Sequence, residues 1–64
     1  MKVKDLLEHY KNEPKPEVSA AAAVGVNPLT LQNWEKRNGL VPLHRAYMAA
    51  AKTGLDVGEE DYQK

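Results

Sequence analysis

Four side chains suited to nucleic-acid recognition lie within six residues, at Gln32, Asn33, Lys36 and Arg37. The carboxamides of glutamine and asparagine can each make two hydrogen bonds to the major-groove edge of adenine. Lysine and arginine supply the cations that bind phosphate oxygens. Leu29, one helical turn earlier, could press on a thymine methyl group. This set predicts contacts with DNA, provided that a helix presents it on one outward face.

The chain contains no comparable set for covalent catalysis or metal binding. Its two histidines, His9 and His44, fall on separate predicted helices, with no serine or carboxylate constellation around either. The absence of cysteine excludes a disulfide framework and any zinc site built on thiolates. All four glycines fall at predicted turns, so there is no phosphate-binding glycine loop. We therefore expect no enzyme, no cofactor, no metal and no small-molecule substrate.

The charge is distributed unevenly along the 64 residues, a length that allows one domain. Residues 1–53 carry eight basic and five acidic side chains, a net charge of +3, whereas residues 54–64 carry one basic and four acidic ones, a net charge of −3. We expect a domain over residues 1–55 and an acidic tail over residues 56–64. No apolar run approaches the roughly 20 residues needed to span a bilayer, which predicts a cytoplasmic protein without membrane contact.

The first helix is predicted by apolar residues spaced at i, i+3, i+4 and i+7, namely Val3, Leu6, Leu7 and Tyr10. It covers about residues 3–11 and ends before Pro14 and Pro16, which lack the backbone donor of a continuing helix. Pro16 suits the first position of a second helix, which the alanines at 20–23 favour. That helix is expected to end at Gly25, where a positive φ is permitted.

A third helix is predicted over residues 28–37, because Asn27 can act as its N-cap and Pro28 as its first residue. Asn38 and Gly39 end it, and Pro42 opens a fourth helix that ends at Thr53 and Gly54. The inner face of the fourth helix is predicted from the same spacing as before, at Leu43, Ala46, Tyr47 and Ala50. The expected fold is all-α, a compact domain of four to five helices, with Trp34 and Tyr47 in its core.

The second and third helices are separated by about three residues around a glycine, which is typical of a helix-turn-helix. Such a pair needs a small residue four positions before the glycine, and Ala21 supplies it. It also needs apolar residues after the glycine, and the chain has Val26, Leu31 and Trp34. In this motif the second helix can lie in the major groove of DNA.

These residues resemble those of the Cro-type repressors of lambdoid bacteriophages. The resemblance is carried by Ala21, Gly25-Val26, Leu31, Gln32-Asn33-Trp34, Val41-Pro42-Leu43-His44-Arg45-Ala46-Tyr47 and Thr53-Gly54. It covers roughly residues 17–55 and implies a lambda-repressor-like homodimer that represses transcription at a short palindromic operator in double-stranded DNA. Some members have an all-helical C-terminal half and others a β-hairpin there, and the helical spacing from Leu43 to Ala50 favours the all-helical form. Many members have glutamine eight residues before the turn glycine. This chain has Glu17, which would repel a phosphate, and its first loop is longer than usual.

Roles follow for three groups of residues. The expected base contacts are Asn27, Pro28, Leu29, Gln32 and Asn33. The expected contacts with the DNA backbone are Lys15, Ser19, Lys36, Arg37 and Arg45. The dimer interface is expected among apolar residues after the third helix, namely Leu40, Val41, Leu43, Met48 and Leu55.

Simpler interpretations stay open for several of these residues. Gln32 and Asn33 could be ordinary exposed helix residues, Leu29 could be tucked under the second helix, and the basic residues could belong to a solvated face. An alternative class of function is a protein-interaction module, such as an antitoxin or anti-repressor that keeps the same scaffold. Zero net charge, Glu17 and the acidic tail favour that class, whereas a polar outer face on the third helix favours DNA.

Overall fold

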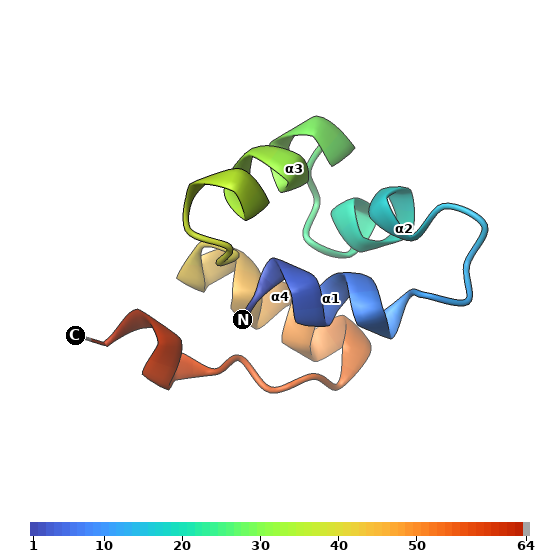
Figure 1. The fold of residues 1–64 in the computed structure, drawn as a ribbon. Coiled ribbons are helices and arrows are strands. Elements are labelled where there is room, and N and C mark those ends of the chain that lie inside the picture. Colours follow the sequence, from blue (N-terminus) through green and yellow to red (C-terminus); the bar gives the residue numbers. More distant parts are fainter. Residues whose placement is uncertain (64) are drawn as a thin grey trace.

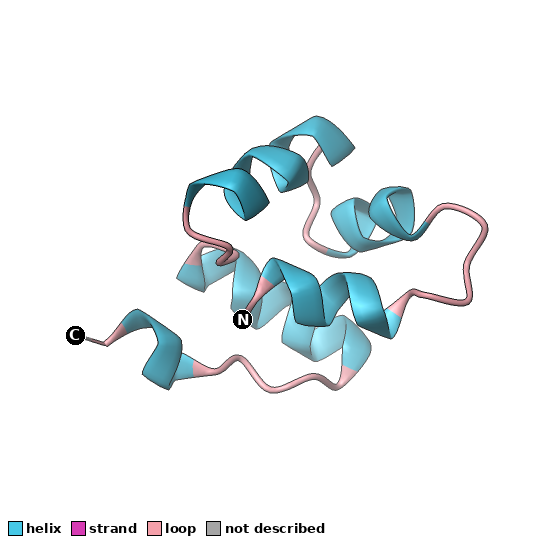
Figure 2. Cartoon of the chain, in the orientation of Figure 1, coloured by secondary structure: helices cyan, strands magenta, loops and turns pink. Residues whose placement is uncertain are grey.

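The computed structural model describes residues 1–63, which form α-helices and one 3-10 helix. The elements are α1 (Val3–His9), α2 (Pro16–Ala23), α3 (Pro28–Arg37), α4 (Leu43–Thr53) and the 3-10 helix η1 (Glu59–Tyr62). Within this range no β-strand is present, and the helices are joined by loops throughout (Figure 2). The expected all-α class with four to five helices is confirmed.

Helix α1 is two residues shorter than the spacing predicts. Its backbone leaves the α-helical pattern after His9, because the amides of Tyr10 and Lys11 donate to the carbonyls three residues earlier, at Leu7 and Glu8. A tight turn of this kind is common at helix ends. The chain then runs through an extended loop to Pro16, the first residue of α2 (Figure 1).

Helix α2 is the centre of the packing, since it contacts α1, α3 and α4. Its buried face consists of alanines at 20, 21 and 23, whose small side chains allow the neighbouring helices to approach closely. Larger side chains from the C-cap of α2, from α1 and α3 and from the loop after α3 complete the core, and the largest that are fully buried are Val3, Leu6, Val24, Leu31 and Val41. Val26 and Trp34 are half-buried against this core, as predicted.

The two ends of the chain are joined to the loop that follows α3. The amide of Val3 donates to the carbonyl of Gly39 at 2.9 Å, and the amide of Val41 donates to the carbonyl of Met1 at 2.9 Å, so the two segments form a short antiparallel bridge. Tyr62 closes the arrangement, because its hydroxyl donates to the Val41 carbonyl and accepts from the Met1 ammonium at 2.7 Å. The amino terminus thus holds the C-terminal end of α3 in place.

Residues 55–62 lie against the domain instead of extending away from it. Leu55 and Val57 pack on the core, and η1 is held by the Tyr62 contacts and by a hydrogen bond of 2.8 Å from the Tyr47 hydroxyl to Glu59. The last residue of the expected acidic tail, Lys64, lies outside the described residues.

Tyr47 corrects one prediction, because its side chain is 48% exposed and not in the core. The buried face of α4 is formed by Ala46 and Ala49, with Ala50 half-buried. This face is rotated about the helix axis relative to the inner face that the apolar spacing predicts. The cause is the close approach of α4 to α2, which alanines permit and a tyrosine ring would prevent. Leu43, at 39% exposure, lies on the same outer edge as Tyr47.

The described helices are all short. The longest of them, α4, has 11 residues, and none within residues 1–63 has the length and apolar character needed to cross a membrane.

Candidate nucleic-acid interface

The connection between α2 and α3 is a tight turn stabilised by specific backbone hydrogen bonds. Gly25 has a φ of +70°, and its amide donates to the carbonyl of Ala22 at 3.1 Å. The amide of Val26 reaches back to the carbonyl of Ala21 at 3.0 Å. These two bonds define a Schellman motif, in which a left-handed residue ends one helix and redirects the chain. Val26 packs on the core, which fixes the direction in which the chain leaves the turn.

Asn27 begins α3 in the way the sequence predicts. Its backbone is extended, and its side-chain oxygen accepts a hydrogen bond of 2.8 Å from the amide of Leu29. Pro28 is the first helical residue, where its missing amide donor has no helical partner to lose. Both residues lie at the N-terminal end of α3, where the positive end of the helix dipole and free amides are available to an anion.

Helix α3 buries one face and exposes the other. Leu31 is buried and Trp34 half-buried, so these residues face the core. On the opposite side Gln32, Asn33 and Lys36 are exposed. Leu29 precedes them on the same side and is 62% exposed, the largest exposure among the large hydrophobic side chains of residues 1–63. The alternative in which Leu29 is tucked under α2 is therefore wrong.

The residues expected to contact the DNA backbone divide into two groups. Lys15 is exposed at the start of α2, and Lys36 and Arg37 are exposed in the last turn of α3. Ser19 is half-buried on α2, and its hydroxyl donates to Glu13 at 3.4 Å. Arg45 differs from these four, because it is a half-buried residue of α4 whose Nη1 donates to the carbonyl oxygen of Val24 at 3.1 Å.

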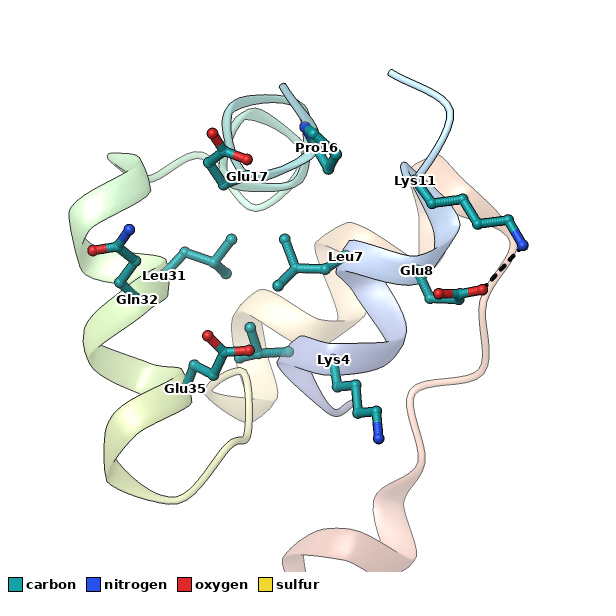
Figure 3. A pocket seen from close by; sticks show the side chains of 10 residues that line it. Lys4, Leu7, Glu8, Lys11, Pro16, Glu17, Leu31, Gln32 and Glu35 are labelled. Atoms are coloured by element: carbon teal, nitrogen blue, oxygen red, sulfur yellow. Dashed lines mark hydrogen bonds and ion pairs between the residues drawn. The ribbon is translucent and has the colours of Figure 1, made fainter. Parts of the chain in front are cut away.

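A groove of about 460 Å³ runs beside α3, between that helix, α1 and the start of α2. Leu7 and Leu31 approach one another across its floor (Figure 3). Glu17 and Glu35 lie on the α2 and α3 side together with Gln32, whose carboxamide points away from α1. Opposite them, Glu8 on α1 pairs at 3.1 Å with Lys11, which lies in the turn after that helix. Gln32 therefore lies at the boundary between the outer face of α3 and a groove edged by carboxylates.

This groove could not be predicted from the sequence, because helical spacing does not reveal which charged residues of three separate helices meet. The same is true of the contact between Arg45 and Val24, which joins residues 21 positions apart.

The five residues expected at a dimer interface are placed differently by the fold. Val41 is 0% exposed and its amide is bonded to Met1, so it belongs to the core and is removed from the interface. Leu40 and Leu55 are half-buried. Leu43 and Met48 are exposed on α4, where Tyr47 accompanies them. The hydrogen bond that the Tyr47 hydroxyl donates to Glu59 raises the pKa of that phenol above its usual value.

No family model, curated protein or solved structure matches the chain. Within residues 1–63, no group of three or more histidine, aspartate or glutamate side chains is arranged to hold a metal ion.

Proposed function

We propose that this chain is a sequence-specific DNA-binding transcriptional repressor of the Cro type. It contains a helix-turn-helix formed by α2 and α3, and α3 enters the major groove. The observation that carries the proposal is the outer face of α3, where Gln32 and Asn33 are exposed beside Leu29. The carboxamides of Gln32 and Asn33 each offer a hydrogen-bond donor and an acceptor, which suits them to adenine, and the Leu29 side chain suits the thymine methyl group.

The contacts around α3 hold its outer face in one orientation relative to α2. Three features support a rigid α2–α3 pair: the Schellman turn at Gly25, the Asn27 cap and the buried Leu31. Lys36 and Arg37, in the last turn of α3, are available for phosphate oxygens that flank the groove. Glu17 opposes this arrangement at the start of α2, so the backbone contact there is weaker than a glutamine would make.

Repression follows from occupancy by a homodimer, in which two copies of α3 enter successive major grooves about 34 Å apart. The operator is then palindromic because the protein is symmetric. The exposed edge of α4, with Leu43, Tyr47 and Met48, is the candidate dimer surface. A stable protein interface buries about 800 Å² on each partner, and three partly exposed side chains supply only a fraction of that. The dimer is therefore weak until DNA brings two copies together.

The test is selection of binding sites from a randomised double-stranded DNA pool at two salt concentrations. A short palindrome should be enriched, with affinity falling as salt rises. Gln32→Ala and Asn33→Ala should each relax the preference at one base position, at a cost of about 1–3 kcal/mol. Gln63→Ala is the matched control, because Gln63 is an exposed carboxamide that lies after η1. It should leave selection unchanged.

The competing class, a protein-interaction module such as an antitoxin or anti-repressor, makes the opposite prediction. No DNA sequence would be enriched at either salt concentration. A protein partner would instead protect the outer face of α3 from hydrogen exchange.

A further inference from the structure

The C-terminal end of α2 lacks a side chain of its own that could satisfy its last carbonyl groups. Its final residues are all alanine, and no basic residue lies in its last turn. The turn amides of Gly25 and Val26 satisfy the carbonyls of Ala22 and Ala21. The carbonyl of Val24, the residue that caps the helix, instead accepts a hydrogen bond of 3.1 Å from Arg45 Nη1 on α4. A cation from a different helix therefore caps the negative end of the α2 dipole.

The same guanidinium lies over Gly25. A Cβ atom placed on this glycine would be 3.3 Å from Arg45 Nη1 and 3.9 Å from Met48 Cε. Arg45 and Met48 are one helical turn apart on α4, so this edge of α4 covers the turn between α2 and α3. Within residues 1–63 no carboxylate is within 4 Å of Arg45, which leaves the Val24 carbonyl as its partner in the fold.

We propose that Arg45 is a positioning residue for α3 and not a phosphate ligand. Its guanidinium ties the α2–α3 turn to α4, and the turn sets the direction in which α3 leaves α2. The consequence for DNA binding rests on the proposed function. Without Arg45 the turn loosens, and the side chains of α3 meet the bases in several orientations instead of one. Affinity then falls although no phosphate contact has been removed.

The first arm of the test uses the free protein and does not depend on DNA. Amide hydrogen exchange is measured for Gly25 and Val26, with the Leu31 amide in the same sample as the reference for opening of the domain. In Arg45→Met, which removes both the charge and the donor, the two turn amides should exchange about tenfold faster relative to Leu31. In Lys52→Met, which removes an exposed cation from the same helix, this ratio should stay constant.

The second arm measures the salt dependence of binding to the selected operator. Loss of one phosphate contact lowers the slope of log affinity against log salt by about one. Arg45→Met should bind about tenfold more weakly with an unchanged slope, whereas Lys36→Met, as a positive control, should show the lower slope. A slope reduced by about one in Arg45→Met would make Arg45 a phosphate ligand and overturn the proposal. Turn amides that keep their wild-type exchange ratio would also overturn it.

A second variant covers the case in which Arg45→Met does not fold. Arg45→Lys keeps the charge but replaces the planar guanidinium with a compact ammonium. If Arg45 positions the turn, the Gly25 and Val26 amides of Arg45→Lys should exchange several-fold faster than in the wild type. Exchange at the wild-type rate would overturn the proposal. If the wild-type chain selects no DNA, the proposed function fails, and the exchange arm still decides whether Arg45 holds the turn.

Discussion

Substitution of Gly25 by alanine tests the local energetics of the α2–α3 turn, and Gly39 provides a matched control. Both glycines have a similar positive φ, +70° and +74°. They differ in their surroundings, because a Cβ on Gly25 would be 3.3 Å from Arg45 Nη1, whereas a Cβ on Gly39 would meet nothing within 4 Å. Gly39→Ala therefore reports the cost of the left-handed backbone alone, and Gly25→Ala reports that cost together with crowding of Arg45.

The magnitudes follow from these two terms. A left-handed conformation costs a residue with a Cβ about 1–2 kcal/mol, which both variants lose. At Gly25 the guanidinium must also move by a few tenths of an ångström, which lengthens its hydrogen bond to Val24 and costs about 1 kcal/mol more. For a domain of this size each kcal/mol lowers the melting temperature by about 4–8 °C. We expect Gly25→Ala to melt about 4–8 °C below Gly39→Ala.

The assay is thermal unfolding followed by circular dichroism, with a double-mutant cycle to isolate the Arg45 contribution. In an Arg45→Met background the crowded donor is absent, so Gly25→Ala and Gly39→Ala should be equally costly, and the coupling between positions 25 and 45 should be about 1 kcal/mol. Equal melting temperatures for the two alanine variants in the wild-type background would contradict this prediction. That result would mean that the guanidinium moves aside at no cost.

Three further predictions concern the chain ends and α2. Tyr62→Phe removes the hydroxyl that bonds to Met1 and Val41, and should cost about 1–2 kcal/mol in a denaturant titration, whereas Tyr10→Phe should cost less than 0.5 kcal/mol. Desolvation lowers the pKa of the Met1 ammonium below 8.0 and raises that of Tyr62 above 10.0. Below pH 8 the unfolded chain holds the Met1 proton more strongly than the folded chain, so the free energy of unfolding should rise up to about pH 8. Above pH 10 the folded chain holds the Tyr62 proton more strongly, so the free energy of unfolding should fall. A free energy of unfolding that does not change between pH 7 and 11 would contradict this assignment. Glu17→Gln should strengthen operator binding about fivefold in a mobility-shift titration, because it removes about 1 kcal/mol of repulsion from a phosphate, and unchanged affinity would place the DNA backbone elsewhere.

The helices and the start of α3 could be predicted from the sequence because local rules determine them. Pro16 and Pro28 begin helices where they were expected, and Asn27 caps α3 with the expected hydrogen bond. The exposed side of α3 followed from Leu31 and Trp34, whose spacing defines the inner face. Each of these features depends on residues within one or two helical turns of one another.

The predictions that failed depend on how the helices approach one another. Tyr47 has the right spacing for the core, but Ala46 and Ala49 are what allow α4 to lie close to α2. In the sequence, Val41 has the character of an exposed apolar residue available for a dimer interface, whereas in the fold its amide donates to the Met1 carbonyl and its side chain is buried. Apolar periodicity locates the buried face of a helix to within about one residue. An error of one residue is enough to assign a surface residue to the core.

Arg45 illustrates why function also needs the fold. In the sequence it is a basic residue after a predicted recognition helix, and phosphate binding is the natural interpretation. In the fold its guanidinium caps α2 and lies over Gly25, so the charge is directed at a carbonyl inside the domain. Lys36 and Arg37 remain exposed in α3 with no such partner within residues 1–63. If Arg45, Lys36 and Arg37 all contacted phosphates, the salt dependence of binding would reflect three charges, whereas the proposed positioning role of Arg45 predicts that only two of these three contribute.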